Sequence, residues 1–210
     1  SGHFKRGMKL THVRSKKPMT ISNPVLFLAN DREIADVAWA GDIIGIPNHG
    51  QLRIGDTLTE GEPLKVTGIP SFAPELLQTC RAGDPLKAKH LEKALTQFSE
   101  EGAAKVFKPS IGSGFIVGVV GALQFEVIQY RLKHEYGASC NYETHNVHKA
   151  CWISCNDKEQ LSEFKKVKYR SMATDKFGRD VFLADSAFTI QMAQQKFTEV
   201  KFHFTSEFED

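Results

Sequence analysis

The sequence predicts an α+β protein: a partial β-barrel, then a ferredoxin-like βαββαβ domain with an additional α/β layer. Two observations indicate this fold class. Short apolar strands separated by glycine and proline fill residues 1–68 without a helical pattern, which is typical of a barrel or sandwich. From residue 69 onward, segments of helical periodicity alternate with apolar strands. We therefore expect a barrel over 1–68, the ferredoxin-like part over 69–149 and a second α/β part over 150–210.

The strands expected in the first domain are short, and each lies next to turn-forming residues. They cover residues 8–13, 19–21, 25–28, 42–46 and 51–54. Glycine, proline and asparagine between them favour tight turns, which we expect at 14–18, 47–50 and 55–56.

Residues 72–142 carry the order strand, helix, strand, strand, helix, strand. Asp84-Pro85 is an N-cap followed by proline at the first helical position, and Gly102 is a natural helix end. The face of this first helix is apolar at Leu91, Ala94, Leu95 and Phe98. The other expected elements are strands over 72–79, 103–108, 115–120 and 138–142 and a helix over 121–137.

The helix over 121–137 carries two apolar stripes. One consists of Phe125, Ile128, Leu132 and Tyr136, and the other of Leu123, Val127 and Tyr130. A helix that is apolar on two sides is expected to pack on two sides.

The last sixty residues are a candidate for covering the second stripe. There we expect strands over 150–154, 181–184 and 200–204 and a short helix over 188–197. A further helix, capped by Asn156 or Asp157, is expected to run through Leu161, Phe164 and Met172.

Composition excludes several classes of protein. The 27 basic and 25 acidic residues leave a net charge of +2, which excludes a strongly basic nucleic-acid module. The longest apolar run, 115–123, spans nine residues, whereas a membrane helix needs about 20. Four irregularly spaced cysteines are typical of free thiols in a reducing compartment.

Known catalytic motifs are absent from the sequence. The dipeptide Gly-Lys does not occur, so there is no P-loop, and neither G-x-S-x-G nor H-E-x-x-H is found. The glycines around Gly112-Ser113-Gly114 precede a strand, whereas a dinucleotide fingerprint follows one and opens a helix. Glu100-Glu101 is typical of a solvated helix end, because neighbouring helix residues do not face each other. We expect no catalytic, cofactor-binding or metal-binding residue in this chain.

One group of side chains leaves a metal site open as an alternative. His145, His148, Cys151 and Cys155 carry atoms that zinc accepts, but their spacing matches no common zinc motif. On one continuous strand His148 would point away from the other three. Free cysteines near a β-core are the simpler interpretation.

Two local groups of cations are candidate contacts for phosphate. The turn Arg14-Ser15-Lys16-Lys17 lies among the first twenty residues, which contain no acid. A second group on the helix expected over 157–172 consists of Lys165, Lys166, Lys168 and Arg170. Both also suit an ordinary solvated surface. As a functional signal they predict phosphate contact with a large RNA, which supplies affinity without sequence specificity.

Several stretches resemble a known family. The first domain is similar to the second, β-barrel domain of translational GTPases at 7–10, 40–46 and 54–59. Later stretches resemble, more particularly, the family of bacterial peptide chain release factor 3. They are Gly-Ile-Pro-Ser-Phe-Ala-Pro-Glu-Leu at 68–76, residues 95–103, Val-Val-Gly-Ala-Leu-Gln-Phe at 119–125, and 182–204.

The resemblance implies a translation-termination role that composition does not show. Members are cytoplasmic GTPases that bind GTP or GDP with magnesium, bind the ribosome and drive class I release factors off it. The order of their domains is a GTPase domain, a barrel and a ribosome-facing α/β domain. This chain lacks a P-loop and begins Ser-Gly-His-Phe rather than Met. We therefore expect a non-catalytic C-terminal portion whose GTPase domain and first barrel strands are missing.

The same resemblance implies the partners. The barrel is expected to face small-subunit rRNA, and the α/β domain a small-subunit ribosomal protein, in a termination complex holding a class I release factor. Neither DNA nor a membrane is an expected partner. The main alternative is a ligand-binding regulatory ferredoxin-like module of a metabolic protein, which depends on fold analogy alone.

Overall fold

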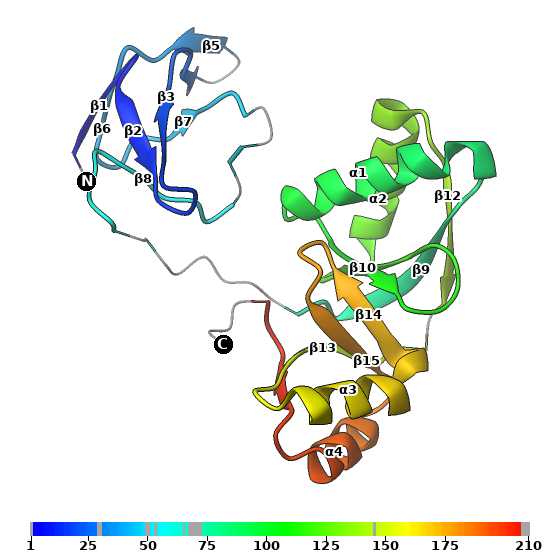
Figure 1. The fold of residues 1–210 in the computed structure, drawn as a ribbon. Helices are drawn as coiled ribbons and strands as arrows, with labels where there is room; N and C mark the ends of the chain where they lie inside the picture. Colours follow the sequence, from blue (N-terminus) through cyan, green and yellow to red (C-terminus); the bar gives the residue numbers. More distant parts are fainter. Residues whose placement is uncertain are drawn as a thin grey trace. The chain divides into compact units, whose positions relative to one another are not determined.

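The computed structural model describes residues 2–28, 31–48, 51–52, 54–64, 66, 73–144 and 146–206. The chain forms two compact units, Ser1–Ile69 and Pro70–Asp210. The chain contains both helices and strands (Figure 1), which confirms the mixed α and β class that the sequence predicted.

The described residues of the N-terminal unit form short strands in three small antiparallel sheets, and these sheets do not close into one barrel. Their orders are β1-β6, β3-β2-β8 and β5-β4-β7. The strands are β1 (His3–Lys5), β2 (Lys9–His12), β3 (Lys17–Thr20), β4 (Val25–Leu28), β5 (Asp31–Ile34), β6 (Val37–Trp39), β7 (Ile44–Gly45) and β8 (Leu58–Thr59).

The strand expected over 51–54 is wrong at the residues that the structure describes, which are 51, 52 and 54; residue 53 lies outside them. Residues 51 and 52 are not in a strand, because their backbone groups bond to a side chain. The Asn48 Oδ1 atom accepts from the backbone N–H groups of Gln51 and Leu52, each at 3.0 Å, and its Nδ2 donates to the Leu52 carbonyl at 2.8 Å. The third strand of the sheet around β2 is instead β8, whose Thr59 pairs with Thr11.

The C-terminal unit contains one eight-stranded antiparallel sheet in the order β12-β9-β11-β10-β14-β15-β13-β16. The first half of its chain has the order β-α-β-β-α-β. Its elements are β9 (Leu76–Ala82), the 3₁₀ turn η1 (Pro85–Lys87), α1 (Ala88–Glu100), β10 (Lys105–Pro109), β11 (Phe115–Val119), α2 (Leu123–Tyr136) and β12 (Cys140–Thr144).

Local sequence signals explain both helices of this half. The Asp84 carboxylate accepts from the Leu86 N–H at 2.9 Å and caps η1, which continues into α1. The buried face of α1 includes all four predicted residues. Gly137 ends α2 in the left-handed conformation at φ 59°, which glycine adopts without a side-chain clash.

The second half repeats the order β-α-β-β-α-β. Its elements are β13 (Lys149–Ser154), α3 (Lys158–Val167), the 3₁₀ turn η2 (Tyr169–Ser171), β14 (Met172–Asp175), β15 (Asp180–Ala184), α4 (Ala187–Lys196) and β16 (Lys201–His203).

The helix expected to run through Met172 ends earlier, at Val167, so the predicted βαβαβ order missed one strand. The backbone leaves the helix at Lys168, and η2 turns the chain. Met172 then begins β14, pairs with Phe182 and is buried. An apolar residue at position 172 is expected both for a buried strand and for one more turn of an amphipathic helix, so the sequence pattern does not distinguish the two.

The two halves have the same strand order, and they join in the sheet through the second strand of each half. In each half the first strand lies between the third and the fourth, and β10 pairs with β14 at the centre through Phe107–Asp175, Lys108–Thr174 and Pro109–Ala173. The two halves, which meet in the sequence at residue 149, therefore share one continuous sheet.

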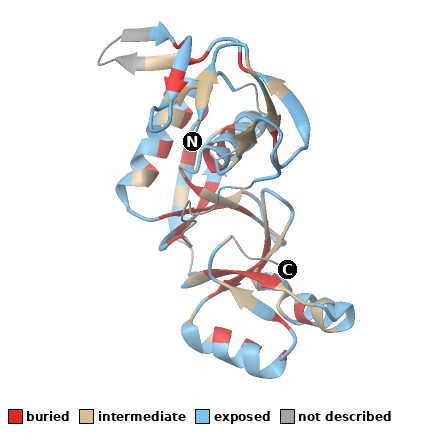
Figure 2. Cartoon of the chain, turned by 90° about the vertical axis from the view of Figure 1, so that its left-hand side faces the viewer, coloured by how far each residue is buried: buried red, intermediate tan, exposed pale blue. Residues whose placement is uncertain are grey.

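Three buried clusters stabilise this unit, and the buried residues lie on the strands and on one side of the helices (Figure 2). The first joins α1 and α2 to the first half, and the second joins α3 and α4 to the second half. The third contains only strand residues from both halves, including Phe107, Ile116, Trp152 and Val181. Since neighbouring strand residues point to opposite faces, the helix-free faces of the two halves share one core.

The second apolar stripe of α2 is not covered within the C-terminal unit. The exposed fractions are 72% for Leu123, 56% for Val127 and 65% for Tyr130. The expectation that residues after 150 cover this stripe is wrong, because β14 extends the sheet beyond β10 and the helices α3 and α4 pack on their own half.

Candidate nucleic-acid interface

The first basic group lies in the hairpin turn between β2 and β3. His12 pairs with Lys17 across the two strands, and residues 13–16 form the turn. Lys16 has φ 56°, and its N–H donates to the His12 carbonyl at 2.8 Å. Lysine rarely adopts this left-handed conformation, so the surrounding structure must hold the turn in place.

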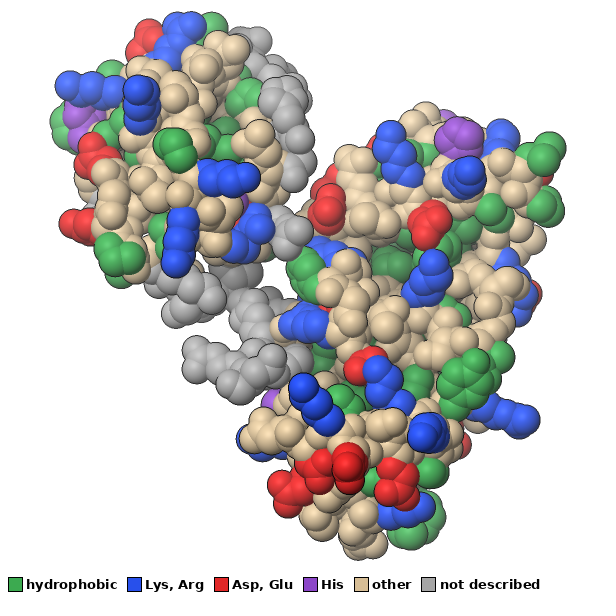
Figure 3. Space-filling view, viewed as in Figure 1, with side chains coloured by type: hydrophobic (Ala, Val, Ile, Leu, Met, Phe, Trp, Pro, Cys, Tyr) green, Lys and Arg blue, Asp and Glu red, His purple; other side chains and the backbone are tan. Residues whose placement is uncertain are grey.

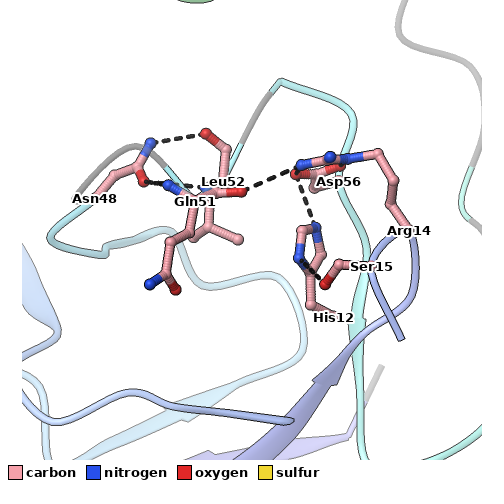
Figure 4. Close-up of polar contacts among 7 residues, drawn as sticks. All are labelled: His12, Arg14, Ser15, Asn48, Gln51, Leu52 and Asp56. Atoms are coloured by element: carbon pink, nitrogen blue, oxygen red, sulfur yellow. Dashed lines mark hydrogen bonds and ion pairs between the residues drawn. The ribbon is translucent and has the colours of Figure 1, made fainter. Parts of the chain in front are cut away.

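A buried carboxylate holds this turn (Figure 4). The Asp56 side chain is only 7% exposed, and it accepts from Arg14 Nε at 2.6 Å and from Arg14 Nη2 at 2.7 Å. Arg14 Nη2 also donates to the Gln51 carbonyl at 3.2 Å. The hydrogen bonding that Arg14 donates to Asp56 raises the pKa of Arg14 above its ordinary value. Arg14 is thus held by an intramolecular, bidentate ion pair.

The buried imidazole of His12 completes the arrangement. Its Nε2 atom lies 2.8 Å from the second Asp56 oxygen, and its Nδ1 atom lies 2.9 Å from the Ser15 hydroxyl (Figure 4). The turn is therefore linked to Asp56 at two positions. Sequence reasoning identified the cations of the turn and missed both His12 and Asp56.

Lys16 lies in the turn and Lys17 begins β3, and neither shares the ion pair that holds Arg14. Both residues are exposed. In the part of the chain that the structure describes, no carboxylate pairs with either ammonium group. These two groups can contact a phosphate directly, whereas Arg14 already donates from Nε and Nη2 to Asp56.

The second basic group surrounds the C-terminal end of α3. Lys165 and Lys166 lie on α3, Lys168 caps the helix and Arg170 lies in η2. Lys165 Nζ is 2.8 Å from Asp180, and Lys168 Nζ lies 5.7 Å from the centre of the Phe182 ring. Lys166 and Arg170 are exposed and form no ion pair with any described residue.

A shallow groove of about 640 Å³ runs along this helix. Its lining combines cations, a hydroxyl and apolar atoms: Lys158, Leu161, Ser162, Lys165, Lys166 and Tyr169. Sequence reasoning identified only cations of this surface and missed Leu161, Ser162 and Tyr169. A helical projection extended to Lys158 and Tyr169 would have found the groove, because residues spaced by four or seven share a helix face.

The orientation of α3 follows from its cap and its core residue. The Asp157 side chain accepts from the N–H groups of Glu159 and Gln160 and fixes the start of the helix. Phe164 is fully buried and forms edge contacts with Phe182, Phe197 and Phe202. With this face buried, charged side chains of both signs cluster over α3 on the outside (Figure 3).

The alternative zinc site is not assembled in the described structure. His145 lies outside the described residues, Cys151 is buried, and the Cys155 thiol donates to the Asp157 carbonyl at 3.2 Å. Burial raises the pKa of Cys151 to about 12. Among the described residues, no group of three His, Cys, Asp or Glu side chains is placed to hold a metal ion.

No described helix combines the length and apolarity that a membrane crossing requires.

Comparisons with known proteins match both units. The family model of elongation factor G domain 2 matches residues 1–61, and that of the class II release factor RF3, C-terminal domain, matches residues 66–194. A crystal structure of a protein from Thermus thermophilus is similar, with a TM-score of 0.58 and 17% identity over 75% of this chain. At this identity the likeness shows the fold alone. The chain matches 25% of the length of that structure.

Proposed function

The chain belongs to the family of class II release factor RF3, whose C-terminal domain matches more than half of it, and we propose that it is the region by which such a factor binds the ribosome. The match to elongation factor G domain 2 in the preceding residues supports a translational GTPase origin for both units. In the full-length factor, GTP with magnesium would be bound by a separate GTPase domain and used to dissociate class I release factors.

The architecture of the C-terminal unit supports a mechanical role for this region. A body that transmits displacement between a GTPase and a ribosome must not deform. Here two halves share one antiparallel sheet and a common strand core. The sheet order β12-β9-β11-β10 with α1 and α2 also supports the finer expectation of a ferredoxin-like plait.

The observation that carries the ribosome contact is the pair of solvent-facing lysines on a fixed turn. Asp56 holds the turn through Arg14 and His12, so Lys16 and Lys17 are presented without an internal partner among the described residues. Ammonium groups placed in this way bind phosphate as point charges. We assign the turn to small-subunit rRNA and the α/β unit to a site that includes a small-subunit ribosomal protein.

Co-sedimentation of the chain with 70S ribosomes over a salt series tests this function. The logarithm of the association constant should fall linearly with the logarithm of the salt concentration. Replacing Lys16 and Lys17 together by alanine should weaken binding and reduce the slope by about 1.4–1.8, since each lost phosphate contact contributes about 0.7–0.9.

The matched control is the double replacement of Lys89 and Lys93 by alanine on α1, where both side chains are exposed. It changes the net charge equally and should leave the slope unchanged. Binding that does not respond to salt, or an equal loss in both double variants, would contradict the proposed contact.

A further inference from the structure

The groove on α3 offers an apolar ring and unneutralised cations on the same surface. Tyr169 is 55% exposed, and Leu161 contributes a partly buried apolar floor beside it. The volume of about 640 Å³ lies within the range of about 300–1,000 Å³ that small-molecule sites occupy. The groove is thus large enough for a single nucleotide.

The Tyr169 backbone is held firmly, so its ring is presented by a rigid element. The Met172 N–H donates to the Tyr169 carbonyl, and the Ser171 N–H donates to the Lys168 carbonyl at 2.8 Å. The preceding helix turn is closed by the bond from the Lys168 N–H to the Phe164 carbonyl, also at 2.8 Å. With the backbone held, only the two side-chain torsions of the tyrosine remain to be ordered when a ligand stacks on its ring.

Charges of both signs lie on the exposed side of α3. Lys158, Lys165 and Lys166 line the groove, whereas Glu159 and Glu163 are not among its lining residues, although Glu163 precedes Lys166 by three positions on the helix. Asp180 neutralises Lys165 at the rim. Lys158 and Lys166 form no ion pair with any described residue, so the lining of the groove keeps two cations that no described carboxylate neutralises.

From this combination we propose that the α3 groove binds one unpaired RNA nucleotide, with the Tyr169 ring stacking on the base and the Lys158 and Lys166 ammonium groups contacting the flanking phosphates. The proposal names an RNA feature for the second unit and depends on the proposed ribosome-binding function. An unpaired base has a free π-face that stacks on aromatic side chains, and its phosphates carry the negative charge that the lysines require. A base inside a duplex offers no such face.

The first test measures binding of a fluorescein-labelled single-stranded RNA decamer to the whole chain by fluorescence anisotropy. Tyr169→Ala should weaken binding roughly 5- to 150-fold, the loss expected for one stacked base. Tyr169→Phe keeps the ring and should bind within about twofold of the original chain. Val167→Ala is the control, because Val167 is also exposed, at 51%, and lies outside the groove.

The lysines are tested by the salt dependence of the same binding reaction. Replacing Lys158 and Lys166 together by alanine should lower the slope of log affinity against log salt by about 1.4, since two single-strand phosphate contacts are lost. The Lys89 and Lys93 double variant should keep the original slope. Far-UV circular dichroism of each variant establishes that the fold is retained.

The outcomes separate this proposal from the proposed function. Equal affinity of Tyr169→Ala and Val167→Ala for the decamer overturns the stacking assignment, as does tighter binding of a blunt RNA duplex. Decamer binding that depends on Tyr169 without co-sedimentation with ribosomes supports the groove and overturns the ribosome-binding function. Ribosome binding that is unchanged in Tyr169→Ala overturns the use of the groove on the ribosome and leaves the Lys16 and Lys17 contact standing.

Discussion

Asp56 shows how one buried side chain can control an exposed basic turn. Its carboxylate contacts the Arg14 guanidinium and the His12 imidazole, each from the neighbouring hairpin. A buried carboxylate is stable only when its oxygens are paired, so the two partners and the carboxylate depend on one another. The conformation of the turn, and with it the direction of Lys16 and Lys17, therefore follows from a residue that is distant in the sequence.

We expect Asp56→Asn to destabilise the N-terminal unit by about 1–3 kcal/mol, because the amide is uncharged and leaves charged or polar partners poorly matched. Arg14 is partly exposed, and water limits the loss to this range. Hydrogen exchange should show reduced protection of the amides in β2, β3 and the turn between them.

Asp36→Asn is the matched control for this substitution. Asp36 also pairs with an arginine, Arg6, but at 3.4 Å and with its side chain 77% exposed, so its loss should change stability by less than about 0.5 kcal/mol. Equal protection of the turn in both variants would show that Asp56 does not hold it.

The helix α2 presents two apolar stripes that sequence alone does not distinguish. The stripe containing Phe125, Ile128 and Leu132 is buried, and Phe125 forms an edge contact with Tyr142 at 4.9 Å between ring centres. The stripe containing Leu123 and Val127 is exposed within its unit. Both have the helical spacing of a core face, because periodicity reports apolar character and not which surface meets the sheet.

Alanine substitutions on α2 measure this difference directly. Phe125→Ala should cost about 3–5 kcal/mol, since it empties a buried site, and should lower the melting temperature of the C-terminal unit. Leu123→Ala, on the same helix and 72% exposed, should cost less than about 0.5 kcal/mol. Thermal denaturation followed by circular dichroism checks both values, and similar melting temperatures for the two variants would reject the assigned orientation of α2.

Elements with a strong local signature were predictable, and elements defined by their partners were not. Asp84-Pro85 predicted a helix start that the structure retains, and of the two predicted caps Asn156 and Asp157 the structure uses Asp157. In contrast, β5 has the sequence Asp-Arg-Glu-Ile without apolar alternation, yet it pairs with β4 along its whole length. β14 likewise owes its conformation to β10 and β15 on either side. Such ladders override weak local preference.

The candidate sites show the same division between local and distant information. Three cations within four residues identified the turn at Arg14–Lys17, because the whole signal lies in one short segment. The ion pair that occupies Arg14 involves Asp56 from another strand region, and no pattern in the sequence joins the two. The pairing of Lys165 with Asp180 also required the fold, since β15 brings that carboxylate beside α3.

At the scale of the whole C-terminal unit, the two β-α-β-β-α-β halves are bound together by more than one device. The sheet passes from β10 to β14, and strand residues of both halves share a helix-free core. Lys176 Nζ of the second half also donates to the Ser99 carbonyl, at the end of α1 in the first half, at 2.6 Å. These contacts favour cooperative unfolding of the two halves.

Phe107→Ala tests this cooperativity. The Phe107 side chain is buried in the shared core and meets Trp152 edge-on at 5.7 Å, so its removal should cost about 3–5 kcal/mol. If the halves unfold as one unit, hydrogen exchange governed by global opening must accelerate by the same factor in β11 of the first half and in β15 of the second. Phe188→Ala on the exposed side of α4 should leave both unchanged. Faster exchange confined to the first half would mean that the halves are independent, and a rigid body that transmits displacement would then require another explanation.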